Sequence, residues 1–337
     1  MKSAVERRNA IVPQMRDYDA LGARQRWVPY LMYFHPPHAR LGAVTTDERG
    51  LRTVVGADPG RPTALLLGGS TAFGIGATSD ATTIASRLSA TTPWSWRNYG
   101  GRAFTSTQET VVAHLMGTDD VTGPIVLFSG ANNLVRACMP GAFDPTFGAV
   151  FWQSAFERQM RAATVGVRAL LRMIAGDLAR RVGAGRGTRG AHDAHDAGPG
   201  DPSAYAAASY EPMLHVLRRD LGYFAMLAAA RGTRCTFVLQ PFAPWIAKAF
   251  TPQERELFAL LDAEQDEFAP VADEMALRGD AYRRDLANIC ADAGVAFVDA
   301  NAAPAFAGAE WMFVDRLHLT DAGQDAAARL IASALRD

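Results

Sequence analysis

Residues 65–74 read LLLGGSTAFG, and this stretch decides the fold. An apolar run that ends in a glycine-serine turn is typical of a buried strand leading into a helix, the start of a parallel α/β sheet. The expected strand covers 64–67, and the helix is expected around 82–88. Ser70 then lies at the carboxyl end of the strand, where open parallel sheets place their ligand sites.

The same pattern recurs at three later places. Short apolar runs occupy 125–128, 236–239 and 295–298, and each ends in polar or turn residues. The chain is therefore expected to form an α/β domain whose strands all end at one edge of the sheet.

A serine hydroxyl is a weak nucleophile at neutral pH. It needs a base, a carboxylate that orients the base, and donors for the oxyanion. Three later segments carry those groups: 98–103 reads NYGGRA, 130–133 reads GANN, and 315–318 reads DRLH.

Together the four segments resemble the SGNH (GDSL-like) hydrolase family. The serine block matches at 68–71, with Gly69 where many members carry Asp. The Gly-x-Asn-Asp block matches at 130–133, and Asp-x-x-His matches at 315–318, shortly before the final helix. The resemblance implies a flavodoxin-like three-layer α/β/α fold with a parallel central sheet. It covers the core strands and the last helix but omits most of 1–60 and 140–235.

The resemblance also implies roles for single residues. Ser70 is expected to be the nucleophile and His318 its general base, which later protonates the leaving group. Asp315 is expected to orient His318. A separation of three residues does not by itself bring Asp315 and His318 into contact, but a turned loop could do so.

The expected oxyanion hole consists of the Ser70 and Ala103 backbone amides and the Asn132 side chain. Keeping Thr105 in register with the family places Ala103 where the family has glycine, and alanine retains the N–H if its φ is negative. Gly100 or Gly101 is the alternative donor.

Further substrate contacts are expected from three polar residues. Arg102 and Arg136 lie beside the oxyanion segments and are candidates to hold a carboxylate or phosphate, while Gln240 either lines the pocket or only caps its strand. Asn133 is expected to hold its own loop. The arginines at 158, 161, 168, 172, 180 and 181 predict a solvated face or, less readily, a site for an acidic carrier protein, a phosphate-bearing substrate or an anionic membrane surface.

The expected organisation is an N-terminal extension at 1–60 packed on a hydrolase-like domain at 61–337. Residues 27–34 suggest an edge strand ended by two prolines. A helical insertion is expected at about 140–235, with a mobile loop at about 183–203 and a helix stop at Gly232. A capping box predicts a helix from Thr251, and the last helix is expected after Thr320.

Composition limits the remaining choices. The formal net charge is −1 over 337 residues, which argues against a nucleic-acid partner. We expect no secretory signal, no membrane span, and a cytoplasmic location with three reduced, buried cysteines. His35 and His38 are expected in a surface loop, and His192 and His195 in the mobile stretch. No metal or organic cofactor is implied.

The sequence thus predicts a serine esterase or acyl hydrolase that acts on a small-molecule or acyl-chain ester through an acyl-enzyme. The insertion is expected to form a lid or an acyl pocket. An acyltransferase with an alcohol, amine or carrier-thiol acceptor would use the same residues. A non-catalytic binding module on a hydrolase scaffold is less favoured, because the full set of site residues is present.

Overall fold

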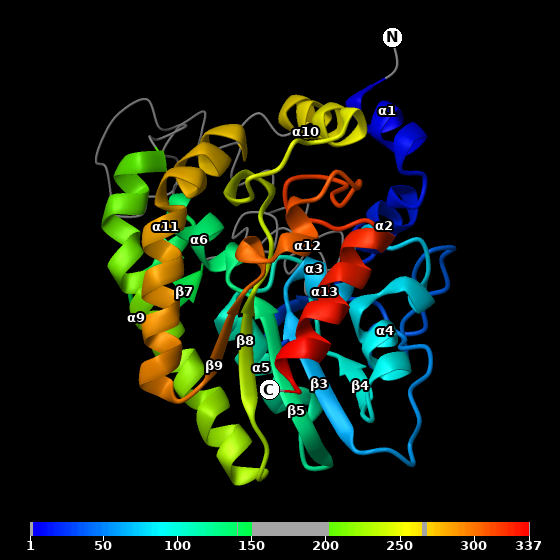
Figure 1. The fold of residues 1–337 in the computed structure, drawn as a ribbon, viewed down its shortest axis with the longest axis vertical. Coiled ribbons are helices and arrows are strands. Elements are labelled where there is room, and N and C mark those ends of the chain that lie inside the picture. The colour runs from blue at the N-terminus through cyan, green and yellow to red at the C-terminus, as the bar shows by residue number, and fades with distance from the viewer. Residues whose placement is uncertain (1–2, 140, 150–201, 265–267, 337) are drawn as a thin grey trace, which may run out of the picture.

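The computed structural model describes residues 3–139, 141–149, 202–264 and 268–336 (Figure 1). Their centre is a parallel sheet of β3 (Thr63–Gly68), β4 (Ser95–Asn98), β5 (Val121–Ser129), β8 (Cys235–Leu239) and β9 (Ala296–Asp299). The spatial order is β4-β3-β5-β8-β9. Counted along the chain this is 2-1-3-4-5, the flavodoxin-like order, and it confirms the predicted fold class.

Helices cover both faces of the sheet, so the domain has three layers (Figure 1). One face carries α5 (Ser106–Met116), α6 (Ala131–Cys138), α9 (Pro202–Ala230) and α11 (Phe268–Ala293); the other carries α4 (Ile84–Thr91) and α13 (Asp321–Ala334). Alternation along β3 divides the core, because Leu65 and Leu67 pack on the first side and Ala64 and Leu66 on the second.

The remaining elements are short or peripheral. They are α1 (Ala4–Ile11), α2 (Met15–Gly22), β1 (Arg26–Val28), β2 (Met32–Phe34), α3 (Ser70–Phe73), η1 (Asp80–Thr82), β6 (Phe143–Asp144), β7 (Gly148–Ala149), η2 (Ala243–Trp245), α10 (Pro252–Glu264), η3 (Ala300–Ala302) and α12 (Pro304–Ala307).

All four predicted strands form, and the structure adds β4 at an edge of the sheet. The segment 95–98 reads SWRN and lacks an apolar run, so only its pairing with β3 makes it a strand. The helix expected around 82–88 is α4, which begins at Ile84 after the short helix η1.

The single edge strand expected at 27–34 is wrong. The segment forms the two-stranded antiparallel sheet of β1 and β2, in which Trp27 pairs with Tyr33. The chain reverses at Pro29 and Tyr30, and Tyr30 adopts a φ of 66°. This φ lies outside the extended region, and the chain turns here, so the apolar run is divided into a hairpin.

Three predicted helix signals are confirmed. Thr251 and Glu254 form the capping box of α10, with their reciprocal side-chain bonds at 2.7 and 3.2 Å. The Thr320 hydroxyl caps α13. Gly232, with a φ of 62°, follows the end of α9.

Several predictions lie outside the described residues. They concern the first helix of the insertion, the loop at about 183–203, the arginine stripe from 158 to 181, and His192 and His195.

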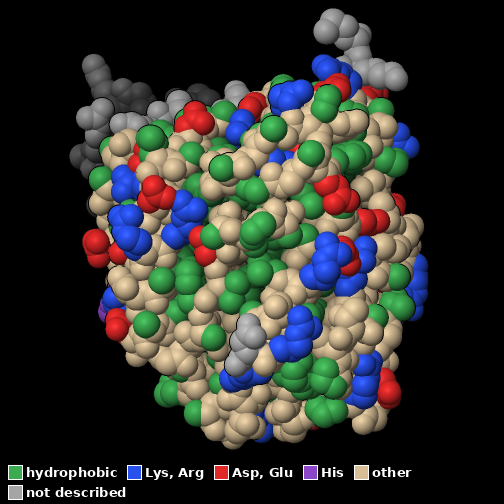
Figure 2. Space-filling model, in the orientation of Figure 1, with side chains coloured by type: hydrophobic (Ala, Val, Ile, Leu, Met, Phe, Trp, Pro, Cys, Tyr) green, Lys and Arg blue, Asp and Glu red, His purple; other side chains and the backbone are tan. Residues whose placement is uncertain are grey.

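Three further properties can be described: the state of the cysteines, the apolar length of the helices and the distribution of charged side chains. Cys138, Cys235 and Cys290 are buried and form no disulfide among themselves. Within the part of the chain that the structure describes, no helix combines the length and apolar character that a membrane crossing needs. Basic and acidic side chains are interspersed on the face drawn in Figure 2, with hydrophobic side chains gathered near its centre.

Candidate active site

Ser70 is held at the junction of β3 and α3. β3 ends at Gly68, whose φ of 148° and close approach to the Phe128 carbonyl leave no room for a Cβ. Gly69 is the N-cap of α3 and Ser70 its first residue. Ser70 is half-buried, and its backbone N–H has no acceptor among the described residues. Both the hydroxyl and this amide are therefore available at the carboxyl edge of the sheet.

The structure brings Ser70, His318 and Asp315 into one hydrogen-bonded series. The His318 Nε2 atom lies 2.7 Å from Ser70 Oγ, and His318 Nδ1 lies 2.6 Å from Asp315 Oδ2. The two ring nitrogens thus face the two different partners. This arrangement suits a base that takes a proton from Ser70 while the carboxylate holds its opposite nitrogen.

A tight reversal of the chain explains how residues three apart make this contact. Phe313 and Leu319 form an antiparallel bridge, and the Val314 N–H donates to the His318 carbonyl at 2.9 Å. At the turn, Asp315 Oδ1 accepts from the Leu317 and His318 N–H groups, both at 2.8 Å. One carboxylate oxygen therefore fixes the loop while the other faces the imidazole.

The charge state of Asp315 follows from the same contacts. Burial by itself would raise its pKa, but the charge of His318, the bond to its ring and the two backbone N–H donors outweigh burial. Together they lower the pKa of Asp315 to about 2. The carboxylate is ionised at neutral pH, as stabilisation of an imidazolium requires.

Asn132, in the first turn of α6, lies against the peptide that precedes Ser70. A Cβ on Gly69 would stand 2.4 Å from Asn132 Nδ2, and this amide nitrogen donates to the Phe104 carbonyl at 2.8 Å. One of its two hydrogens is therefore used to hold the side chain, and the other remains for a ligand.

The backbone amides of 100–103 divide into engaged and unengaged ones. Gly100 N–H donates to Asn98 Oδ1 at 2.9 Å, and Gly101 N–H donates to the Gly68 carbonyl at 3.1 Å. The Ala103 N–H has no acceptor among the described residues. Of these three amides, that of Ala103 is the one free to donate to a ligand.

The negative φ expected for Ala103 is wrong, because the observed φ is +53°. The left-handed conformation costs an L-residue about 1–2 kcal/mol. Alanine keeps its N–H in that conformation, so the donor survives at the expense of local strain.

The other predicted substrate contacts are engaged within the protein. Arg102 Nη1 donates to the Tyr18 carbonyl at 3.0 Å, and Arg136 is buried near Met139. Gln240 is buried and donates from Nε2 to Thr71 Oγ1 at 3.1 Å. Thr71 in turn donates to the Leu317 carbonyl at 3.1 Å, so Gln240 helps tie α3 to the His318 loop.

His35 contradicts the expected surface loop, whereas His38 is exposed. The His35 ring is 1% exposed and stacks on Phe73, with 4.0 Å between ring centroids. Burial, followed by the charge of Arg102, lowers the pKa of His35 to about 3 and keeps the ring neutral. The prolines beside it indicated a loop, but only tertiary packing shows that this loop is covered.

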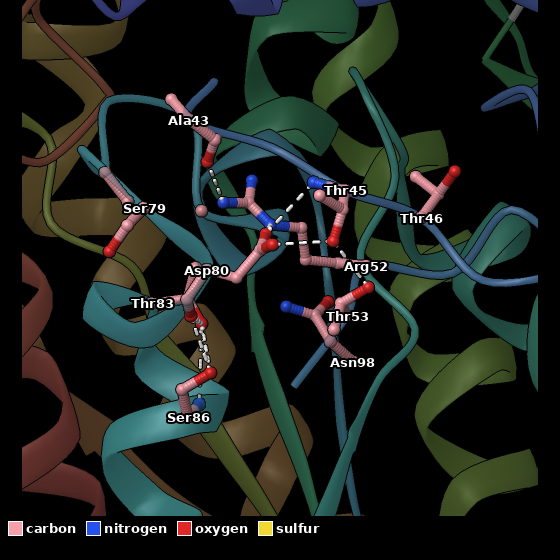
Figure 3. Close-up of polar contacts among 12 residues, drawn as sticks. Ala43, Thr45, Thr46, Arg52, Thr53, Ser79, Asp80, Thr83, Ser86 and Asn98 are labelled. Carbon is pink, nitrogen blue, oxygen red and sulfur yellow. Dashed lines mark hydrogen bonds and ion pairs between the residues drawn. The ribbon is translucent and has the colours of Figure 1, made fainter. Parts of the chain in front are cut away.

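The sequence did not predict the ion pair between Arg52 and Asp80, which lies beside Phe73 of α3. Arg52 Nε lies 2.6 Å from Asp80 Oδ1, and Asp80 also accepts from the Thr45 backbone and hydroxyl (Figure 3). The Arg52 guanidinium lies over the Phe73 ring at 5.2 Å. The Tyr18 hydroxyl contacts the Gly74 and Ala77 carbonyls at 2.8 Å each. No motif in 1–60 signals these contacts, which join that segment to the turn after Ser70.

The site suits nucleophilic chemistry. It combines a base and a carboxylate aligned on the Ser70 hydroxyl with the unengaged Ser70 amide at the start of α3. In the part of the chain that the structure describes, no three His, Cys, Asp or Glu side chains are grouped to hold a metal ion.

No protein-family model matches the chain, and no curated protein matches it. The extracellular lipase of Streptomyces rimosus is 14% identical, with a TM-score of 0.41 over 81% of this chain and 99% of that one. A member of the lipolytic protein G-D-S-L family from Veillonella parvula is 11% identical, with a TM-score of 0.40 over 80% and 96%. LAE5, an alpha/beta hydrolase enzyme from the metagenome of Lake Arreo, Spain, is 12% identical, with a TM-score of 0.41 over 82% and 95%. At these values the similarities carry no argument about activity, which depends on the geometry of the site.

Proposed function

We propose that this protein is a serine hydrolase that cleaves carboxylic esters through an acyl-enzyme on Ser70. The observation that carries the proposal is the unbroken series from Asp315 through His318 to Ser70 Oγ, with contacts of 2.6 and 2.7 Å. Ser70 is also the first residue of α3, and its own amide N–H has no acceptor among the described residues, which leaves it to donate to the oxyanion.

In the first half of the reaction, His318 Nε2 takes the proton of Ser70 Oγ as that oxygen attacks the ester carbonyl. The oxyanion accepts hydrogen bonds from the Ser70 and Ala103 amides and from Asn132 Nδ2. His318 then gives the proton to the leaving alkoxide as the carbon–oxygen bond breaks. Asp315 stays ionised and holds the imidazolium.

In the second half, water takes the place of the alcohol. His318 removes a proton from the water, the hydroxide attacks the acyl carbon, and Ser70 leaves with the proton returned by His318. The acid product and the free enzyme result, and no electron acceptor is needed.

Transfer of the acyl group to an alcohol, an amine or a carrier thiol is the alternative within the same proposal. It differs only in the second nucleophile. We also retain a cytoplasmic location as a proposal, supported by buried thiols that form no disulfide within the described residues.

The test is covalent labelling with a fluorophosphonate probe, combined with hydrolysis of p-nitrophenyl esters from acetyl to octanoyl. We expect one labelled site at Ser70, and loss of labelling and hydrolysis in Ser70→Ala. Ser333→Ala, at an exposed serine of α13, is the matched control and should behave as the unchanged protein. Labelling that persists in Ser70→Ala would contradict the proposal, as would a protein that no probe labels.

Mass spectrometry of products formed with added alcohols or amines separates hydrolysis from transfer. Formation of the free acid alone supports hydrolysis. A new ester or amide that accumulates in preference to the acid supports the transferase alternative.

A further inference from the structure

A carboxylate on α9 contacts the helix that follows the oxyanion segment. Asp220 is 3% exposed, and its Oδ2 atom accepts from Ser106 Oγ at 2.7 Å and from Thr107 Oγ1 at 2.8 Å. Its Oδ1 atom pairs with Arg219 Nε at 2.9 Å. Both hydroxyls belong to the first turn of α5, where negative charge also suits the helix dipole.

Ser106 also forms hydrogen bonds with Asn133 on α6. Its backbone N–H donates to Asn133 Oδ1 at 3.2 Å, and its Oγ accepts from Asn133 Nδ2 at 2.9 Å. A carboxylate can only accept, so Asp220 fixes the direction of the Ser106 O–H and leaves the hydroxyl oxygen to Asn133. The orientation of the buried Asn133 amide therefore depends on Asp220.

Ser106 and Asn133 lie next to the two oxyanion donors that are separate from Ser70. Ser106 follows Ala103 by three residues, and Asn133 follows Asn132 directly. The bond from Asn132 Nδ2 to the Phe104 carbonyl joins the same two segments a second time. The segment 104–106, at the start of α5, and the start of α6 are thus connected by two sets of hydrogen bonds.

We propose that Asp220 is a positioning residue of the oxyanion hole, which holds the Ala103 N–H and Asn132 Nδ2 at the separation that a tetrahedral oxyanion requires. The inference rests on the proposed function and adds a residue that contacts neither substrate nor nucleophile. Donors in such a hole act through preorganisation, so a small displacement lowers the rate of the chemical step more than substrate binding.

The test compares Ser106→Ala with Thr107→Val. Both remove one hydroxyl from the same carboxylate oxygen, but only Ser106 contacts Asn133. We expect Ser106→Ala to lower kcat by about 10- to 100-fold with KM unchanged, and Thr107→Val to leave kcat unchanged. Asp220→Asn should resemble Ser106→Ala, because it places a donor where an acceptor is needed.

A second measurement separates positioning from folding. A trifluoromethyl ketone forms a tetrahedral adduct with the serine and fills the oxyanion hole, so its affinity should fall with kcat in Ser106→Ala and Asp220→Asn. Asp285→Asn is the control, since it disturbs a different α9 contact, the 2.7 Å bond from Tyr210. That variant should change thermal stability alone.

Two results would overturn the inference. One is loss of stability in Ser106→Ala and Asp220→Asn with kcat and ketone affinity unchanged. The other is an equal loss of kcat in Thr107→Val, because Asp220 would then merely anchor α9 to α5. Failure of the proposed function is recognised separately, by activity or labelling that persists in Ser70→Ala.

Discussion

Asn132 Nδ2 occupies the space that a side chain on Gly69 would need, 2.4 Å from the position of its Cβ. The φ of Gly69 is −80°, which any residue can adopt, so the need for glycine comes from this neighbour and not from the backbone. In this structure, the position of the Asn132 amide is therefore what favours glycine at residue 69.

Gly69→Ala is expected to lower kcat by about 10²- to 10³-fold, as does removal of one oxyanion donor. The added methyl group pushes the Asn132 amide away from Ser70 while the fold is retained. Steady-state kinetics with a p-nitrophenyl ester measures the effect. When Asn132→Ala is already present, Gly69→Ala should lower kcat little further. Additive losses of kcat in the double variant would refute this explanation.

Ala103→Gly is expected to raise the free energy of unfolding by about 0.5–1 kcal/mol with activity retained. Glycine adopts the observed φ of +53° without strain and keeps the N–H, although it loses more backbone entropy on folding. Urea denaturation gives the stability change. Ala103→Val, with a branched side chain at positive φ, should be destabilised, and equal stability of the two variants would argue against the strain.

Glu109→Gln is expected to remove a pH dependence of stability. Burial raises the pKa of Glu109 to about 8, despite its bond to Ser129. Between the unfolded value of 4.5 and about 8, the unfolded chain is ionised while the folded chain holds a proton, so stability falls as pH rises through this range. Urea midpoints measured across this range should decline less in Glu109→Gln than in the unchanged protein. Parallel curves would show that Glu109 does not titrate in this way.

Arg52→Ala is expected to lower the free energy of unfolding by about 3–5 kcal/mol, because it leaves the Asp80 carboxylate without its buried partner (Figure 3). Arg97→Ala is the control, since it breaks the more exposed pair with Asp120 and should cost at most about 1 kcal/mol. Chemical denaturation of both variants provides the comparison. Similar losses of stability in the two variants would mean that burial of the ion pair does not determine the free-energy cost of breaking it.

Much of this molecule is decided locally. The apolar runs at 64–67, 125–128 and 236–239 are strands because each is buried on both faces, whereas the run at 295–298 forms the half-buried edge strand β9 beside β8. The helix starts at Thr251 and Thr320 follow from side chains that cap their own backbone. The resemblance of the four site segments to the SGNH motifs was enough to predict that His318 meets Ser70 and that Asp315 meets His318.

Other features depend on contacts between distant segments, which no local pattern encodes. β4 is a strand because it pairs with β3, and His35 is covered because Phe73 lies against it. The positive φ of Ala103 appears only in the folded chain, and so does the difference between its unengaged amide and those of Gly100 and Gly101, which find acceptors there. Asp220 reaches Ser106 across 114 positions of the chain. Such features are decided by packing and by the need to satisfy buried polar groups, and these exist only once the chain has folded.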